Sequence, residues 1–192
     1  RALEQILDEA DSPEITRFLS AVDVRIDGFR VEEASEGRNR RVFVRHNVGG
    51  KHYELRLPEE SAGTQKLLGL AAFLLMAFNR GATVVVDELD AKLHPKLLRY
   101  VILLFKDPEV NKSGAQLIFS SQDVSTMRND VFRRDEIWFA ARGEGEASQL
   151  WSLADIHEAN GNLVSRNAAF DKQYLSGRYG ADPYLTRIEE WD

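Results

Sequence analysis

A run of three valines, Val84–Val86, followed directly by the acids Asp87 and Glu88, constrains the fold of this chain more than any other stretch. A short β-branched run without polar residues predicts a strand buried on both faces, as in a parallel sheet. In open α/β sheets, ligands bind beyond the carboxyl ends of the strands. One carboxylate at such a place can hold a hydrated Mg²⁺ ion, and a second can orient or deprotonate a water molecule. Two solvated acids at a strand end are the alternative interpretation.

Helix and strand patterns alternate around this run. The apolar spacing from Gln65 to Phe78 predicts a mostly buried helix that ends at Gly81, and Pro95 opens another helix. A second short buried strand is expected at Gln116–Phe119. Because sequential strands are often neighbours, the polar residues that follow it should lie beside the two acids. The alternation from residue 58 to residue 140 therefore predicts a parallel α/β layer.

Antiparallel additions are expected on both sides of this layer. Residues 41–46 and 52–57, separated by Gly49-Gly50, predict one hairpin, and residues 137–140 and 149–153 predict another. The remaining expectations are helices at 2–9, 13–19 and 166–175, with Ser12 as an N-cap, a strand at 22–27, and loops at 32–41 and 176–185. Trp191 is expected to pack or to fray. The predicted fold class is α/β, a mixed sheet with flanking helices and antiparallel hairpins.

Composition limits the classes of function. The 192 residues suffice for one core and a small appendage, and the net charge of −6 gives no electrostatic indication of general nucleic-acid binding. A local basic groove would still be compatible with nucleic-acid contact. The chain has no cysteine for disulfides or thiol ligands, and no apolar run approaches the roughly 20 residues of a membrane helix. We expect a cytoplasmic protein without a membrane span and, because the sequence starts at Arg1, a part of a longer chain.

A polar stretch, residues 60–66 (Glu-Ser-Ala-Gly-Thr-Gln-Lys), leads into the first of these helices. Ser, Gly and Thr at a helix N-terminus form an anion site, because free N–H groups, hydroxyl donors and the positive end of the helix dipole coincide there. An ordinary helix cap made by Ser61 or Thr64 is the alternative. A third polar segment, Ser-Ser-Gln-Asp at 120–123, follows the second strand.

The order of these three segments resembles the C-terminal half of an ABC-type ATPase with a P-loop NTPase-like fold, in the branch of the SMC-like and overcoming-lysogenization-defect proteins. Residues 61–65 resemble its signature loop, residues 84–88 its Walker B strand and residues 89–95 its D-loop. Residues 134–139 and 174–181 resemble AAA-type ATP-binding proteins of bacterial abortive-infection systems. The resemblance implies that residues 1–57 are the end of a helical insertion plus a β-hairpin, and that residues 58–192 are the C-terminal lobe.

The resemblance implies ATP and Mg²⁺ as cofactors and gives three residues a place in hydrolysis. Asp87 would position Mg²⁺, Glu88 would act on the attacking water, and Gln122 would face the γ-phosphate. The family usually has His at the position of Gln122. Glutamine can hydrogen-bond a phosphate but cannot titrate, so hydrolysis would be slow or organised differently.

The same resemblance implies a head-to-tail homodimer, in which the signature loop of one copy caps ATP held by the other. Residues implied to contact nucleotide or partner are Ser61, Gly63, Thr64, Lys66 and Asp90. The sequence has no Gly-x-x-x-x-Gly-Lys-Ser/Thr loop, so the expected partner is an N-terminal half that carries this Walker A loop. We expect these 192 residues alone neither to bind ATP tightly nor to hydrolyse it.

Several interpretations stay open at this stage. The leading one is an ATPase of anti-phage (abortive infection) defence, with an effector protein as a further partner. The alternatives are a DNA-repair ATPase of the same SMC-like fold and a nucleotide-independent interaction module. The basic residues of the first hairpin, Arg38, Arg40, Arg41, Arg45 and Lys51, form a solvated face or a phosphate contact. The four histidines lack metal-ligand spacing, and His94 is expected to be a local cap or a dimer contact.

Overall fold

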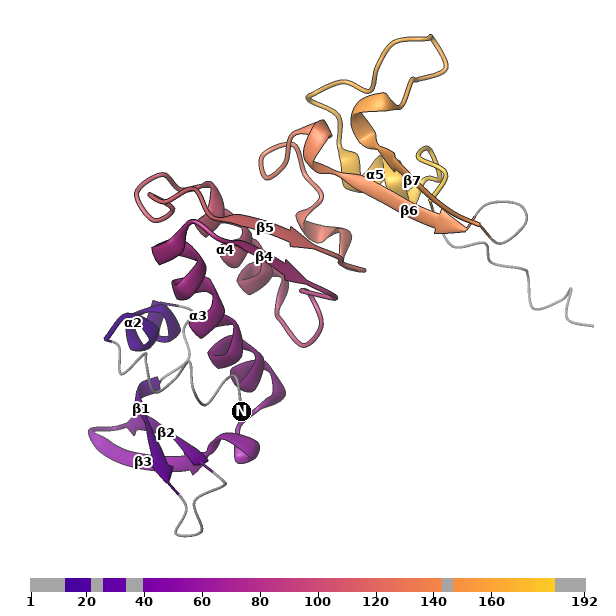
Figure 1. Cartoon of the computed structure of the whole chain (residues 1–192). Helices are drawn as coiled ribbons and strands as arrows, with labels where there is room; N and C mark the ends of the chain where they lie inside the picture. The colour runs from indigo at the N-terminus through magenta and orange to yellow at the C-terminus, as the bar shows by residue number, and fades with distance from the viewer. Residues whose placement is uncertain (1–12, 22–25, 34–39, 143–146, 182–192) are drawn as a thin grey trace, which may run out of the picture. The chain divides into compact units, whose positions relative to one another are not determined.

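The computed structural model describes residues 13–21, 26–33, 40–142 and 147–181. The chain divides into two compact units, Arg1–Gln122 and Asp123–Asp192, which are treated separately below. The helix expected at 2–9, the cap at Ser12 and the packing of Trp191 lie outside the described residues. The confirmed fold class is mixed α/β with a parallel strand pair and antiparallel hairpins, and the described strands form three small sheets (Figure 1).

In the first unit, an antiparallel sheet and a parallel strand pair are connected by one long helix. The sheet has the order β1-β2-β3, and β4 pairs with β5 in parallel. The elements of the first unit are α2 (Pro13–Ala21), β1 (Ile26–Glu33), β2 (Arg40–Val48), β3 (Lys51–Arg56), η1 (Leu57–Glu59), α3 (Ala62–Arg80), β4 (Thr83–Val86), α4 (Pro95–Lys106) and β5 (Gln116–Phe119).

Helix α3 is the scaffold of this unit. It begins at Ala62, three residues earlier than predicted, because the Ser61 hydroxyl caps it by accepting the Thr64 N–H at 3.1 Å. Its buried residues lie on more than one side, as predicted, since α2 and α4 both pack against it. The buried apolar residues are Leu67, Leu68, Leu70, Ala71, Ala72, Leu74, Ala77 and Phe78. Gly81 ends it with a φ of 65°, in the left-handed region, as predicted.

The turn at Gly81 fixes where β4 starts. A Cβ at this position would lie 2.4 Å from the carbonyl oxygen of Ser113, so only glycine fits the conformation and the space. The ladder then runs from Thr83 opposite Gln116 to Val86 opposite Phe119. The predicted pairing of the two sequential strands is confirmed.

The prediction that both faces of this strand pair are buried is wrong for one face. Val85 is 72% exposed and Ile118 is 58% exposed, although both are apolar and central in their strands. Helix α3 contacts β4 and helix α4 contacts β5, and α4 lies behind the pair in the view of Figure 1. Within the described part of the first unit, no element covers the face that carries Val85 and Ile118.

The first hairpin is confirmed, but the loop predicted at 32–41 is wrong at its start, because β1 extends to Glu33. Gly49 and Gly50 form the β2–β3 turn with positive φ angles of 59° and 79°. Cross-strand contacts explain the extension of β1. The Arg30 guanidinium lies 4.1 Å from the centre of the Phe43 ring and donates hydrogen bonds to Glu32 and Glu54.

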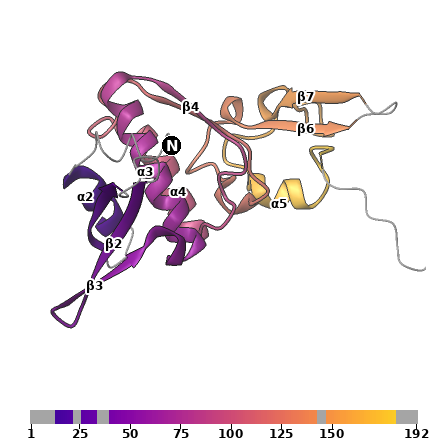
Figure 2. The ribbon, with the colours of Figure 1, turned by 60° about the horizontal axis from the view of Figure 1, so that its bottom comes forward.

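The second unit is built around a small aromatic core. Its elements are η2 (Val124–Thr126), η3 (Arg134–Glu136), β6 (Trp138–Arg142), β7 (Ser148–Ser152), η4 (Leu153–Asp155) and α5 (Phe170–Leu175). Figure 2 shows α5 beside the β6–β7 hairpin. Phe139 and Phe170 are buried in this core, and the Phe139 ring stacks on that of Tyr174 at 5.7 Å. Burial raises the pKa of Tyr179 to about 12, and its hydroxyl donates to Gln173 at 2.6 Å.

The second hairpin is confirmed, whereas the helix predicted at 166–175 is shorter than expected and begins at Phe170. A turn precedes it, in which the Ser165 hydroxyl accepts the Asn167 N–H and the Ser165 carbonyl accepts the Ala168 N–H. Serine satisfies nearby N–H groups in this way and so competes with helix formation.

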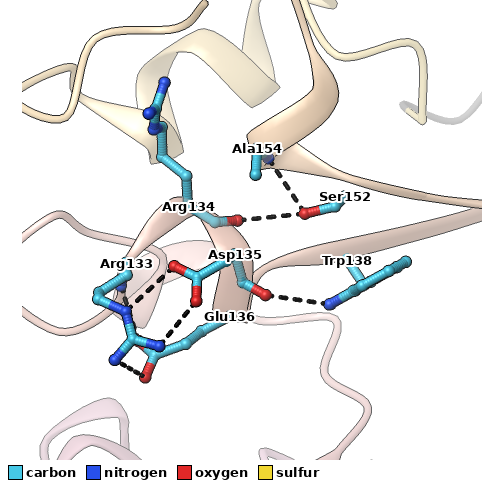
Figure 3. A network of polar contacts seen from close by, with 7 residues as sticks. All are labelled: Arg133, Arg134, Asp135, Glu136, Trp138, Ser152 and Ala154. Atoms are coloured by element: carbon cyan, nitrogen blue, oxygen red, sulfur yellow. Dashed lines mark hydrogen bonds and ion pairs between the residues drawn. The ribbon is translucent and has the colours of Figure 1, made fainter.

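A polar turn joins η3 to both strands of this hairpin (Figure 3). The Arg133 guanidinium pairs with Asp135 at 2.7 Å and with Glu136 at 3.2 Å. The Trp138 indole donates to the Asp135 carbonyl, and the Ser152 hydroxyl donates to the Arg134 carbonyl. These ion pairs are exposed and screened by solvent, so they define the shape of the turn more than they stabilise it.

We expect Asn111→Ala to destabilise the first unit. The Asn111 amide donates to the carbonyls of Phe105 and Ala115 at 2.8 Å each and accepts the Ala115 N–H at 2.6 Å, which ties the end of α4 to the start of β5. Its loss should lower the free energy of unfolding by about 2–3 kcal/mol, measured by urea denaturation followed by circular dichroism. Asn79→Ala is the control, since Asn79 is exposed and makes no side-chain hydrogen bond among the described residues. Equal effects of the two substitutions would contradict the assignment.

Candidate active site

The Ser120 hydroxyl joins the two acids at the carboxyl ends of β4 and β5. Its Oγ donates to Asp87 Oδ1 at 2.5 Å and accepts the Glu88 N–H at 2.8 Å. The main chain continues the link, because the Ser120 N–H donates to the Val86 carbonyl and the Leu89 N–H donates to the Ser120 carbonyl. Polar residues after β5 therefore lie beside Asp87 and Glu88, as predicted.

Asp87 is suited to hold a cation. Its side chain is exposed, and only Oδ1 is hydrogen-bonded within the described part of the chain, which leaves Oδ2 available. No cluster of three or more His, Asp or Glu side chains that could hold a metal ion occurs among the described residues. Mg²⁺ keeps several waters and takes further oxygens from phosphates, so one carboxylate is a sufficient protein ligand.

Glu88 has an unusual backbone conformation. Its φ is 49°, in the left-handed region, which costs a non-glycine residue about 1–3 kcal/mol. Two side chains and one main-chain group contact this residue: Ser120 accepts the Glu88 N–H, and the Glu88 carbonyl accepts Lys66 Nζ at 2.6 Å and the Ala91 N–H at 3.1 Å. The Glu88 side chain is exposed, and its carboxylate makes no hydrogen bond with another described residue.

An open cleft of about 440 Å³ lies between the start of α3 and the turn after β4. Its lining contains both acids and two lysines: Ala62, Gln65, Lys66, Asp87, Glu88, Ala91 and Lys92. Partial burial lowers the pKa of Lys66, against the raising effect of the Asp90 and Glu88 carboxylates. The cleft can therefore present both a carboxylate for a cation and ammonium groups for an anion.

The turn after β4, residues 89–94, packs closely on the first turn of α3. A Cβ at Gly63 would lie 3.1 Å from the Lys92 carbonyl oxygen, so glycine permits the approach. Leu89 is fully buried and anchors the turn. Asp90 accepts the Gln122 N–H at 3.3 Å through Oδ2, while Oδ1 is buried without a hydrogen bond among the described residues.

Three predicted site residues are placed differently from the group around Ser120. Gln122 meets Asp90 through its main chain, and its side chain is exposed. Thr64 is buried, and its hydroxyl lies 2.9 Å from Ser61 Oγ, so both hydroxyls belong to the cap of α3. The ordinary-cap interpretation therefore describes this helix start, and the nucleotide contacts of Ser61 and Thr64 stay predictions.

The contact between His46 and Glu60, next to the predicted signature loop, was not predicted from the sequence. His46 Nε2 on β2 lies 2.5 Å from Glu60 Oε1, and the Glu60 side chain is only 5% exposed. The Glu60 carbonyl also accepts the Gln65 side-chain amide at 2.8 Å. The signal was the strict alternation of Val42, Val44 and His46, which places the imidazole on the same buried face as the valines.

The other weak candidates have structural roles in the described residues. Arg45 and His52 both pair with Asp27, at 3.4 Å and 2.6 Å, which favours the solvated-face interpretation of the basic hairpin. His94 caps α4 by accepting the Lys96 N–H on Nδ1, so the local-cap expectation is confirmed. No helix in the described ranges has the length and apolar character required to cross a membrane.

Comparisons with known proteins agree with the fold. No curated protein matches the chain. A solved structure described as "Structural biochemistry of ATP-driven dimerization and DNA stimulated activation of SMC ATPases" is similar with a TM-score of 0.53 and 16% identity, covering 78% of this chain and 88% of the other. The Smc head domain with coiled coil and joint from Pyrococcus yayanosii is similar with a TM-score of 0.52 and 16% identity, over 80% of this chain and 28% of the other. At this identity the likeness shows the fold alone.

A family model supplies the assignment that the fold alone does not. Residues 3–128 match the model described as "AAA domain, putative AbiEii toxin, Type IV TA system". The match spans the first unit, including all eight predicted site residues, and ends before the tail segments at 134–139 and 174–181, whose resemblance stays a prediction. This chain belongs to the AbiEii-type AAA-domain family.

Proposed function

We propose that this chain is the C-terminal lobe of an ABC-type ATPase and supplies the Walker B acids, the D-loop and the signature loop to an ATP site. The observation that carries the proposal is the Ser120 hydroxyl, which holds Asp87 and Glu88 together at the carboxyl end of a parallel strand pair. The AAA-domain family and the SMC-like fold support it.

The two acids fit the chemistry of phosphoryl transfer to water. Asp87 offers Oδ2 to a hydrated Mg²⁺, which when bound neutralises charge on the phosphate oxygens. The Glu88 carboxylate has no protein partner within the described residues, so it is free to accept a proton or a hydrogen bond from the attacking water. The water oxygen bonds to the γ-phosphorus while the bond between the γ-phosphorus and the β–γ bridging oxygen breaks, and ADP leaves.

The start of α3 fits the role of a signature loop. The helix has 19 residues and a Ser61 cap, and Gly63 brings its first turn against the Lys92 carbonyl without a side chain in between. In the proposed homodimer, Ser61 and Gly63 contact the γ-phosphate held by the partner, with Asp90 at the interface. One of the similar structures concerns ATP-driven dimerisation of SMC ATPases, which supports this arrangement.

The open face of the β4–β5 pair supports an N-terminal half as a further partner. Val85 and Ile118 form an apolar surface at the centre of two parallel strands, which are usually covered on both faces. We propose that the segment carrying the Walker A loop covers this face and brings that loop to Asp87. The 192 residues contain no Gly-x-x-x-x-Gly-Lys-Ser/Thr of their own.

The biological setting that we propose is anti-phage defence, in which ATP turnover by this module controls an effector protein. The family description, with its AbiEii toxin and type IV toxin–antitoxin system, supports this setting. A DNA-repair ATPase is the second candidate, because one of the similar structures concerns DNA-stimulated activation of SMC ATPases. Stimulation of turnover by DNA in the full-length protein would favour the second candidate.

Glu88→Gln in the full-length protein should keep ATP binding, abolish most turnover and trap an ATP-bound dimer. The amide keeps the shape of the side chain but cannot take a proton from water. Light scattering with and without ATP reports the dimer, and phosphate release reports turnover. Glu109→Gln, at an exposed residue distant in sequence from the acids, is the control and should leave both readouts unchanged. Wild-type turnover in Glu88→Gln would remove Glu88 from the catalytic role.

Gln122→Ala should lower turnover without lowering the melting temperature. The structural link of this residue to Asp90 runs through the main-chain N–H, so alanine removes only the exposed amide. Gln122→His should keep or raise turnover, because a protonated imidazole adds a charge-assisted hydrogen bond, roughly twice as strong as a neutral one. Gln149→Ala on β7 is the matched control. Unchanged turnover per folded molecule in Gln122→Ala would refute the γ-phosphate assignment.

A further inference from the structure

We propose that Lys66 is a positioning residue that fixes the Glu88 peptide and thereby couples the signature helix α3 to the catalytic carboxylate of the same chain. The inference rests on the proposed function, in which Glu88 acts on the attacking water. It assigns Lys66 a role distinct from the nucleotide contact that the family resemblance implies.

The first step is that the Glu88 peptide is held from both sides. Ser120 Oγ accepts its N–H at 2.8 Å and Lys66 Nζ donates to its carbonyl at 2.6 Å. A glutamate at a φ of 49° occupies a sparsely populated conformation, which persists only where surrounding contacts impose it. The Ala91 N–H also donates to the Glu88 carbonyl, at 3.1 Å, so Lys66 adds a side-chain contact to a main-chain turn. Since φ and ψ at this residue set the direction of the side chain, loss of the Lys66 contact would let the carboxylate turn more freely.

The second step is that the two contacts come from different elements. Ser120 follows β5 and belongs to the same strand pair as Glu88, whereas Lys66 lies in the second turn of α3. The Lys66 bond is therefore a direct link, across 22 residues of sequence, between the predicted signature helix and the Walker B turn.

The third step is that the start of α3 cannot shift without moving Lys66. The Ser61 cap fixes the first turn, and the Glu60 carbonyl accepts the Gln65 side chain. Glu60 is in turn held by His46 of β2 at 2.5 Å. A phosphate that binds at this helix start would therefore act on the first turns of α3, and Lys66 is the residue of these turns that contacts Glu88.

The fourth step is electrostatic. Lys66 lies in the cleft with Glu88 and Lys92 and within the field of Asp90, whose carboxylate opposes the lowering of the Lys66 pKa by burial. Lys66 Nζ donates to the Glu88 carbonyl in this mixed field at 2.6 Å. Capping of ATP by one chain would in this way adjust the hydrolytic acid of that chain, so that the two sites of a dimer respond to each other.

The test compares Lys66→Met and Lys66→Arg in the full-length protein, with ATP turnover measured across ATP concentrations. Methionine keeps the apolar stem but removes the donor, so kcat should fall about ten- to a hundredfold while KM for ATP stays within about twofold. Arginine restores a donor and should recover part of kcat. Lys96→Met, at an exposed lysine of α4 whose side chain makes no hydrogen bond among the described residues, is the matched control.

A raised KM with unchanged kcat in Lys66→Met would overturn the proposal in favour of a direct phosphate contact, and so would the absence of any change. Hydrogen exchange at the Glu88 and Leu89 amides gives a second readout that needs no ATP. It should accelerate about fivefold in Lys66→Met and not in Lys96→Met, because the turn at Glu88 should open more readily once Lys66 no longer holds its carbonyl. If the wild type lacks turnover, the proposed function fails, while unchanged exchange would overturn the Lys66 link itself.

Discussion

The arrangement of the candidate site depends on one hydroxyl group. Ser120 donates to Asp87 and accepts from the main chain of Glu88 through the same oxygen. A hydroxyl oxygen can be both donor and acceptor, which this position requires. The parallel register, with Val86 opposite Phe119, delivers this oxygen to the acids, so a shift of one residue between β4 and β5 would separate the serine from both.

Helix α3 connects the strand pair that carries this hydroxyl with the antiparallel sheet of the first unit. Its N-terminus is tied to the antiparallel sheet through Glu60 and His46, and its C-terminus delivers the chain to β4 through the left-handed turn at Gly81. Both ends are therefore fixed by contacts outside the helix, and the buried apolar faces between them resist bending. One continuous helix, α3, thus connects the start that resembles a signature loop with the strand that resembles Walker B.

Local apolar patterns, together with the Gly and Pro residues that begin or end helices, explain what could be predicted from the sequence. The valine run, the apolar spacing of α3, Gly81 and Pro95 act over a few residues, and the elements follow them closely. The extension of β1 depends on contacts of Arg30 with Phe43 and Glu54 in the partner strands, and His46 meets Glu60 across 14 residues, so no local pattern encodes these contacts. The positive φ of Glu88 is likewise imposed by Ser120 and Lys66, so it could not be predicted from a residue type that disfavours it.

The uncovered face of the β4–β5 pair affects how prone the newly synthesised chain is to self-association. A two-stranded sheet is marginal by itself, and strands with open edges and apolar centres recruit other strands. While Val85 and Ile118 are uncovered, this pair is open to self-association. If the proposed N-terminal half covers this face, cellular yield would depend on how quickly that half associates, which ties the abundance of Asp87 and Glu88 to the order of assembly.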